Sequence, residues 1–317
     1  QPNRAYAEVS RTAHELQKIG PQLVNLQIKN DVAILYSLDS ANALDFMPFA
    51  LAGARQWQMG SVEADYKTVV DQLHRALYNN NVGTDFVFPE DPDFSRYKLI
   101  VIPPLYIADD ALLNKIAAYV HGGGHVLMAF KSGFANENSA VRAELAPGPL
   151  REATGISYQE FSNLEKPLTL KGDPFHAGDN NKVMYWAEFL KLDHAKALAT
   201  YDHPFFGRWP AITRNQYGSG SLTYEGTFLS DALQQSVVRD ALRDAQIATP
   251  SLPEHVIEKS GVNAQGKTLH YILNYSSTAH TFTYSQRAAT DLLTGRSIAP
   301  SQSIDLAPWD LVILEEN

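Results

Sequence analysis

Two short apolar runs with a helical pattern between them form the most regular part of the chain, from residue 97 to residue 133. The first run is Leu99–Ile102 and the second is Val126–Phe130. The segment between them has apolar residues at three- and four-residue spacing, which is typical of a helix with one buried face, and Gly122–Gly124 end it. Continuous apolar strands joined by one amphipathic helix predict a right-handed βαβ unit whose strands are buried on both faces.

The alternation of strand and helix patterns extends over residues 31–250. Strand patterns occupy Asp31–Tyr36, Thr84–Phe88, Ala197–Tyr201, Ala211–Tyr217 and Ser221–Phe228, and helical patterns occupy Ala64–Tyr78 and Asp231–Ala245, the second capped by Ser230. The last two strands flank a tight Gly-Ser-Gly turn and predict a hairpin. Residues 163–193 are interpreted as mostly loop. This order predicts an α/β domain with a mostly parallel sheet flanked by helices.

The two ends of the chain differ from this domain. After Pro250 and Pro253 only strand patterns remain, which predicts a small all-β domain over residues 251–317. Residues 1–30 contain one amphipathic helical pattern, Ala5–Ile19. This helix either ends a domain that precedes the chain or packs on the domain that follows. Because the chain begins with Gln1, we expect other residues to precede it in its parent protein.

Composition narrows the class of protein. The 317 residues are 44% apolar and 19% charged, as in ordinary globular proteins, and the net charge of −9 disfavours binding to nucleic acid or to an anionic membrane. No apolar run reaches the ~20 residues of a membrane-spanning helix. The absence of cysteine excludes disulfides, thiolate catalysis and cysteine-ligated zinc in this chain.

The residues with reactive side chains near strand ends form no convincing catalytic set. Ser132 follows the strand that ends at Phe130, but a nucleophile elbow needs small residues where this chain has Phe130 and Phe134. We therefore interpret Ser132 as a loop-capping residue. His121 and His125 flank the three glycines without a third ligand at a suitable spacing. We assign no catalytic residue, no metal ligand and no cofactor-binding residue, and we expect no cofactor.

A long segment, residues 37–60, separates the first strand from the next helix and is interpreted as a loop with an unusual number of aromatic residues. Long loops inside α/β domains often form a lid or an interface. The candidate interface or active-site rim consists of Asp39, Asp45, Phe46, Phe49 and Trp57. The alternative is that these aromatic side chains fold back onto the core.

Several motifs occur in the order found in a known enzyme family. The chain contains DVAILYSLDSANALDFMP from Asp31, DQLHRALYNNNVGTDFV from Asp71, the βαβ unit described above and PGPLREATGI from Pro147. Together they resemble the trimerisation domain of family 42 glycoside hydrolases, the bacterial β-galactosidases. Further motifs, ILNYSS from Ile272, DLLTG from Asp291 and LAPWDLVILEE from Leu306, resemble the small β-domain that ends those enzymes.

The resemblance implies that the catalytic residues belong to a domain outside this chain. In that family a preceding TIM barrel carries both catalytic glutamates, and no alternating pattern of roughly 250 residues precedes Asp31. The resemblance therefore implies self-association into a trimer, a missing barrel as partner, and hydrolysis of terminal β-D-galactosides with retention only in the full-length enzyme. It also implies a class I glutamine amidotransferase-like fold, whose cysteine would fall at Lys131-Ser132-Gly133.

Two hypotheses of different classes follow. The first is a non-catalytic assembly region of a family 42 β-galactosidase. The second is a free-standing amidotransferase-like module that binds a sugar or a small metabolite, which the aromatic residues of 37–60 suggest. The segment 37–60 would face the missing barrel or a neighbouring subunit in the first case and a ligand in the second.

Overall fold

The computed structural model describes residues 3–50 and 64–317, which form two compact units. Residues 30–249 form the larger unit, and residues 3–29 join residues 250–317 in the smaller one. In the described residues no helix is both long and apolar enough to cross a membrane. Whether residues 1–30 end a preceding domain stays a prediction.

The larger unit is built on a seven-stranded sheet in the order β2-β1-β3-β4-β11-β10-β9. The first five strands are parallel to their neighbours, and β10 and β9 are added antiparallel. The bounds are β2 Thr84–Val87, β1 Val32–Leu35, β3 Leu99–Ile102, β4 His125–Ala129, β11 Gly220–Glu225, β10 Pro210–Tyr217 and β9 Lys196–Thr200. The predicted hairpin is confirmed as β10–β11.

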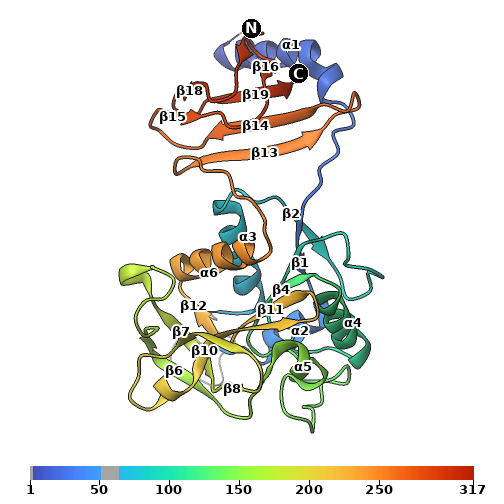
Figure 1. Ribbon diagram of the computed structural model, residues 1–317. Helices are drawn as coiled ribbons and strands as arrows, with labels where there is room; N and C mark the ends of the chain where they lie inside the picture. Colours follow the sequence, from blue (N-terminus) through green and yellow to red (C-terminus); the bar gives the residue numbers. More distant parts are fainter. Residues whose placement is uncertain (1–2, 51–63) are drawn as a thin grey trace. The chain divides into compact units, whose positions relative to one another are not determined.

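Both faces of this sheet are covered, as the continuous apolar runs predict. Alternate residues of β1, β3 and β4 pack on one face with α3, Tyr66–Asn79, and α6, Asp231–Asp244 (Figure 1). The intervening residues pack on the other face with α4, Asp110–His121. Asp109 caps α4 by accepting from the Leu112 amide at 2.7 Å. The central βαβ unit is therefore confirmed.

The structure corrects several expectations in this unit. Residues 163–193 are not mostly loop, because β7, Val183–Glu188, pairs on one side with β6, Phe161–Leu168, and on the other with β12, Thr227–Leu229. The single strand expected over Ser221–Phe228 is interrupted at Gly226, so that β11 and β12 belong to different sheets. Ser230 occupies the N-cap of α6 but makes no side-chain cap bond; its hydroxyl bonds the Asn180 carbonyl instead.

Smaller elements complete the larger unit. Residues 37–60 are not one loop, because Leu38–Phe46 forms the helix α2. The other bounds are η1 Gly148–Leu150, α5 Arg151–Thr154, β5 Ile156–Ser157, η2 Gly178–Asn180, β8 Lys191–Leu192 and η3 Phe206–Arg208. The strand β5 pairs with β8.

The smaller unit is antiparallel, in agreement with the strand patterns. Its five-stranded sheet has the order β13-β14-β19-β16-β17, and β15 pairs with β18. The bounds are β13 Val256–Val262, β14 Thr268–Asn274, β15 His280–Thr283, β16 Ala289–Asp291, β17 Ser297–Ile298, β18 Ser303–Leu306 and β19 Leu311–Glu316. The helix α1, Arg4–Leu23, packs on this sheet through Ile19, which contacts Leu269 and Ile313.

Candidate functional site

The carboxyl ends of the parallel strands carry α2, which begins directly after β1. The Ser37 side chain caps the helix by accepting from the Ser40 amide at 3.2 Å. The Ser40 hydroxyl both donates to the Ile107 carbonyl and accepts from the Ile107 amide, at 3.2 and 3.1 Å. The Tyr66 hydroxyl accepts from the Ser37 amide at 2.9 Å. These bonds fix α2 between the ends of β1 and β3.

The structure places the predicted rim residues in different environments. Asp39, Asp45 and Phe46 are exposed on α2, and Phe46 is 87% exposed. Phe49 is only 3% exposed, and its ring meets Phe130 edge to face with centroids 4.9 Å apart. Trp57 lies outside the described residues. The two interpretations of this segment therefore apply to different residues, since Phe46 faces solvent and Phe49 belongs to the core.

An exposed apolar surface accompanies Phe46. Leu38 and Met47, at the two ends of α2, are 63% and 52% exposed. Large exposed apolar side chains that occur together mark interaction surfaces more often than single ones do. We call Leu38, Phe46 and Met47, with the flanking Asp39 and Asp45, the α2 surface.

A hollow of about 340 Å³ lies next to the α2 surface. Asp39, Asn42 and Glu137 line it. The neighbouring Asn136 stabilises the loop of residues 136–140, because its Oδ1 accepts from the amides of Asn138 and Ala140 at 3.0 and 3.1 Å. No group of three histidine or acidic side chains suited to a metal ion occurs among the described residues.

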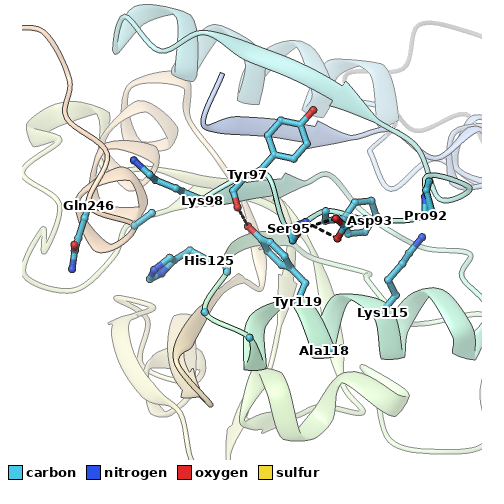
Figure 2. A pocket seen from close by; sticks show the side chains of 15 residues that line it. Pro92, Asp93, Ser95, Tyr97, Lys98, Lys115, Ala118, Tyr119, His125 and Gln246 are labelled. Atoms are coloured by element: carbon cyan, nitrogen blue, oxygen red, sulfur yellow. Dashed lines mark hydrogen bonds between the residues drawn. The ribbon is translucent and has the colours of Figure 1, made fainter. Parts of the chain in front are cut away.

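A larger hollow of about 610 Å³ lies at the opposite, amino-terminal edge of the sheet (Figure 2). Lys98, at the start of β3, and His125, at the start of β4, line it. His125 Nδ1 lies 2.8 Å from the Ser221 hydroxyl and 3.2 Å from Asp244 Oδ2. Because serine and aspartate meet the same ring nitrogen, and Ser221 is buried, this trio lacks the relay geometry of a catalytic triad.

The turn after β4 carries no accessible hydroxyl nucleophile. Ser132 is fully buried; its Oγ donates to the Ala129 carbonyl at 2.7 Å and accepts from the Leu105 amide at 3.0 Å. This is the loop-capping role that the sequence predicts. Lys131 beside it has φ +60°.

A buried carboxylate beneath this turn is the main polar feature that sequence reasoning missed. Glu188, at the end of β7, accepts from the Lys131 amide at 2.7 Å, the Trp186 indole at 3.1 Å and the Tyr224 hydroxyl at 2.9 Å. Burial raises the pKa of Glu188 to about 7, although these hydrogen bonds favour the charged form. The donors come from the turn after β4, from β7 and from β11, so Glu188 links the two sheets.

Comparison with known proteins finds a matching family model and several similar proteins. A family model described as the β-galactosidase trimerisation domain matches residues 30–248. The chain is 28% identical over 312 residues to the β-galactosidase LacZ of Lactobacillus acidophilus, covering 98% of this chain and 44% of that protein. It is 32% identical over 226 residues to the β-galactosidase BgaB of a Geobacillus species, covering 71% of this chain and 32% of that protein.

The fold is also similar to solved structures. A β-galactosidase from Bacillus circulans sp. alkalophilus superimposes with a TM-score of 0.84 at 24% identity, over 99% of this chain and 45% of that one. The chain thus spans less than half the length of each of these relatives.

Proposed function

Because this chain belongs to the β-galactosidase trimerisation domain family, we propose that it is the non-catalytic region through which a longer β-galactosidase assembles into a trimer. The observation that carries the proposal is the family match over residues 30–248, joined to relatives that are more than twice as long as this chain. In the parent protein, a barrel domain with two catalytic glutamates would hydrolyse terminal β-D-galactosides with retention.

The α2 surface is the part of this unit that we assign to assembly. Fully burying a phenylalanine side chain contributes about 1.5–3 kcal/mol, and Phe46 leaves most of its ring in solvent. A partner surface that covers Phe46, Leu38 and Met47 would therefore gain several such contributions at once. Asp39 and Asp45 on the same helix would offer charged partners to basic groups at the rim of the contact. The partner is a neighbouring subunit or the barrel.

The finer description of the fold is part of the proposal. Five parallel strands followed by an antiparallel pair, with the sharp turn after β4, suit an amidotransferase-like ancestor. Lys131 then stands at the turn where that class carries a cysteine. A thiolate-dependent amide transfer cannot proceed from this position.

Light scattering on the purified chain tests the assembly proposal. A trimer has a mass of about 105 kDa, three times the 35.1 kDa of one chain. Phe46→Asp should lower the mass toward the monomer if a neighbouring subunit covers the α2 surface. Phe205→Asp is the matched control, because Phe205 is 67% exposed in the same unit but lies outside α2. A monomer at high concentration would show that this region alone does not drive assembly.

The non-catalytic part of the proposal has its own assay. The chain should not hydrolyse a chromogenic galactoside, and robust turnover would refute it. The alternative, a sugar- or metabolite-binding module, is favoured by the hollow lined by Asp39, Asn42 and Glu137. Calorimetry with galactose and lactose separates the two, since heat of binding that Asp39→Ala removes would support the alternative.

A further inference from the structure

Lys131 lies just beyond the carboxyl end of β4, at a backbone position that lysine rarely occupies. Its φ of +60° is in the left-handed region, which is strained for a residue with a Cβ atom. The Lys131 amide is held there by the Glu188 carboxylate, 2.7 Å away. Carboxyl ends of parallel strands are where open α/β sheets bind ligands, and strained residues concentrate at functional sites.

Four aromatic rings surround the Lys131 ammonium. Nζ lies 3.9 Å from the ring centroid of Trp186 and 5.3, 5.7 and 5.9 Å from those of Tyr106, Phe134 and Phe161. Among the residues that the structure describes, none offers Nζ a hydrogen-bond acceptor. Lys131 is half-buried and Phe161 is 43% exposed, so this ring of side chains opens to solvent.

Lys115 is also partly buried beside an aromatic ring, but its amine has hydrogen-bond acceptors. Its Nζ also lies over a ring, 4.6 Å from the centroid of Phe94. It donates in addition to the carbonyl oxygens of Pro89 and Asp91, both at 2.7 Å. Two carbonyl acceptors therefore engage the Lys115 amine, whereas the Lys131 amine makes no such bonds to the described residues.

The surroundings of Lys131 weaken the protonated form of its amine relative to that of an exposed lysine. Removing an ammonium from water is unfavourable, and cation–π contacts with the surrounding rings offset part of this cost. Burial therefore lowers the pKa of Lys131, against the attraction of the Glu188 charge. Because the pKa of Glu188 is about 7, that charge is only partly present at neutral pH.

We propose that Lys131 is a nucleophilic amine that forms a reversible imine with small aldehydes, inside the site walled by Tyr106, Phe134, Phe161 and Trp186. The nitrogen lone pair adds to the carbonyl carbon, and a proton passes from nitrogen to oxygen to give the carbinolamine. The carbon–oxygen bond then breaks, the departing hydroxyl takes up the remaining N–H proton and leaves as one water, and the nitrogen lone pair forms the C=N bond of the imine; addition of water reverses the sequence. The step needs no oxidant or reductant, and it is independent of the assembly role.

Reductive alkylation at single-lysine resolution tests this proposal. The purified chain is treated with glycolaldehyde and cyanoborohydride at pH 7, and peptide mass spectrometry follows the modification of each lysine with time. Lys131 should be modified several-fold faster than the exposed Lys171, and faster still than Lys115. In urea, where the surroundings are lost, the three rates should become similar.

The controls keep the outcome decisive. Lys131→Arg retains the charge but has no primary amine, so it should remove the fast modification without affecting the other lysines. If that variant does not fold, the site-resolved rates in the unsubstituted protein still decide. A rate at Lys131 equal to or below that of Lys171 in the folded protein overturns the proposal. A rate difference that persists in urea overturns it as well, because the cause would then be local sequence.

Discussion

Phe46 and Phe49 are three residues apart, and truncating each to alanine should affect different properties. Phe49→Ala should lower the stability of the fold, and Phe46→Ala should weaken association. Phe49 is almost fully buried, and its ring packs on Phe130 and Phe228 with centroids 4.9 and 6.1 Å away. A buried Phe→Ala change costs about 3–5 kcal/mol, to which aromatic pairs of this kind contribute about 0.5–1.5 kcal/mol each. Phe46 has 87% of its surface in solvent, so its truncation should change the free energy of unfolding by no more than about 0.5 kcal/mol.

Urea unfolding of dilute, monomeric protein measures the first half of this prediction. With a slope near 3 kcal/mol per molar, the Phe49→Ala midpoint should fall by about 1 M or more, and that of Phe46→Ala should stay where it is. Analytical ultracentrifugation measures the second half. Loss of about 1.5–3 kcal/mol per covered ring corresponds to a roughly 10- to 100-fold weaker association for Phe46→Ala, if a neighbouring subunit covers it.

Two results would refute the reasoning. A midpoint of Phe46→Ala that falls as far as that of Phe49→Ala would mean that Phe46 is part of the core. An unchanged midpoint for Phe49→Ala would mean that the aromatic contacts beneath α2 do not stabilise the unit.

Three further predictions concern buried polar groups. Burial alone would lower the pKa of His270, but hydrogen bonds with Glu258 and Glu316 at 2.8 and 3.0 Å outweigh it, and the pKa is raised. The protonated His270 therefore stabilises the fold below about pH 6.5, and this stabilisation is lost as pH rises through the higher folded-state pKa. The melting temperature of His270→Gln should lack this decline. Burial raises the pKa of Glu188 from 4.5 to about 7, so the folded state binds more protons than the unfolded state in that interval, and stability should fall as pH rises across it. Burial raises the pKa of Glu225 to about 8 and adds a fall of the same sign, so Glu188→Gln should make the fall smaller; an undiminished fall would contradict the assignment. Ser132→Ala leaves a buried amide without its acceptor and should cost about 1–3 kcal/mol in urea unfolding, with no change in any residual hydrolysis of a galactoside.

The sequence predicts those parts of the fold whose signal is local. The runs that became β3 and β4 are continuous and apolar because α3 and α6 cover one face and α4 the other, so each position contributes to the pattern. The strands β6 and β7 give no such signal. In β6 five of the eight residues are exposed, and the β7 residues that pair with it lie 15 to 27 positions away in the chain.

The candidate site was predictable only in part, for a related reason. The exposed half of α2 could be singled out, because aromatic residues in a polar segment are unusual. Nothing in the sequence indicates that Phe49 is buried and Phe46 exposed, since the rings that bury Phe49 belong to residues 81 and 179 positions further along the chain. The sequence around Glu188 does not indicate that it is buried, because two of its three donors, Lys131 and Tyr224, lie 57 and 36 residues from it.

Directly after β4, the edge of the sheet that binds ligands in open α/β folds is filled with aromatic side chains in this protein, and this bears on the proposed assembly. Phe49 packs against Phe130 directly after β4, and Phe130 in turn stacks on Trp186, which donates to Glu188. Phe49 follows α2 in the chain, so the contacts that fill the edge also anchor the helix that carries the exposed Phe46. The contacts that fill this part of the edge therefore also support the α2 surface. The assembly surface that we propose on α2 would therefore rest on a densely packed part of the core.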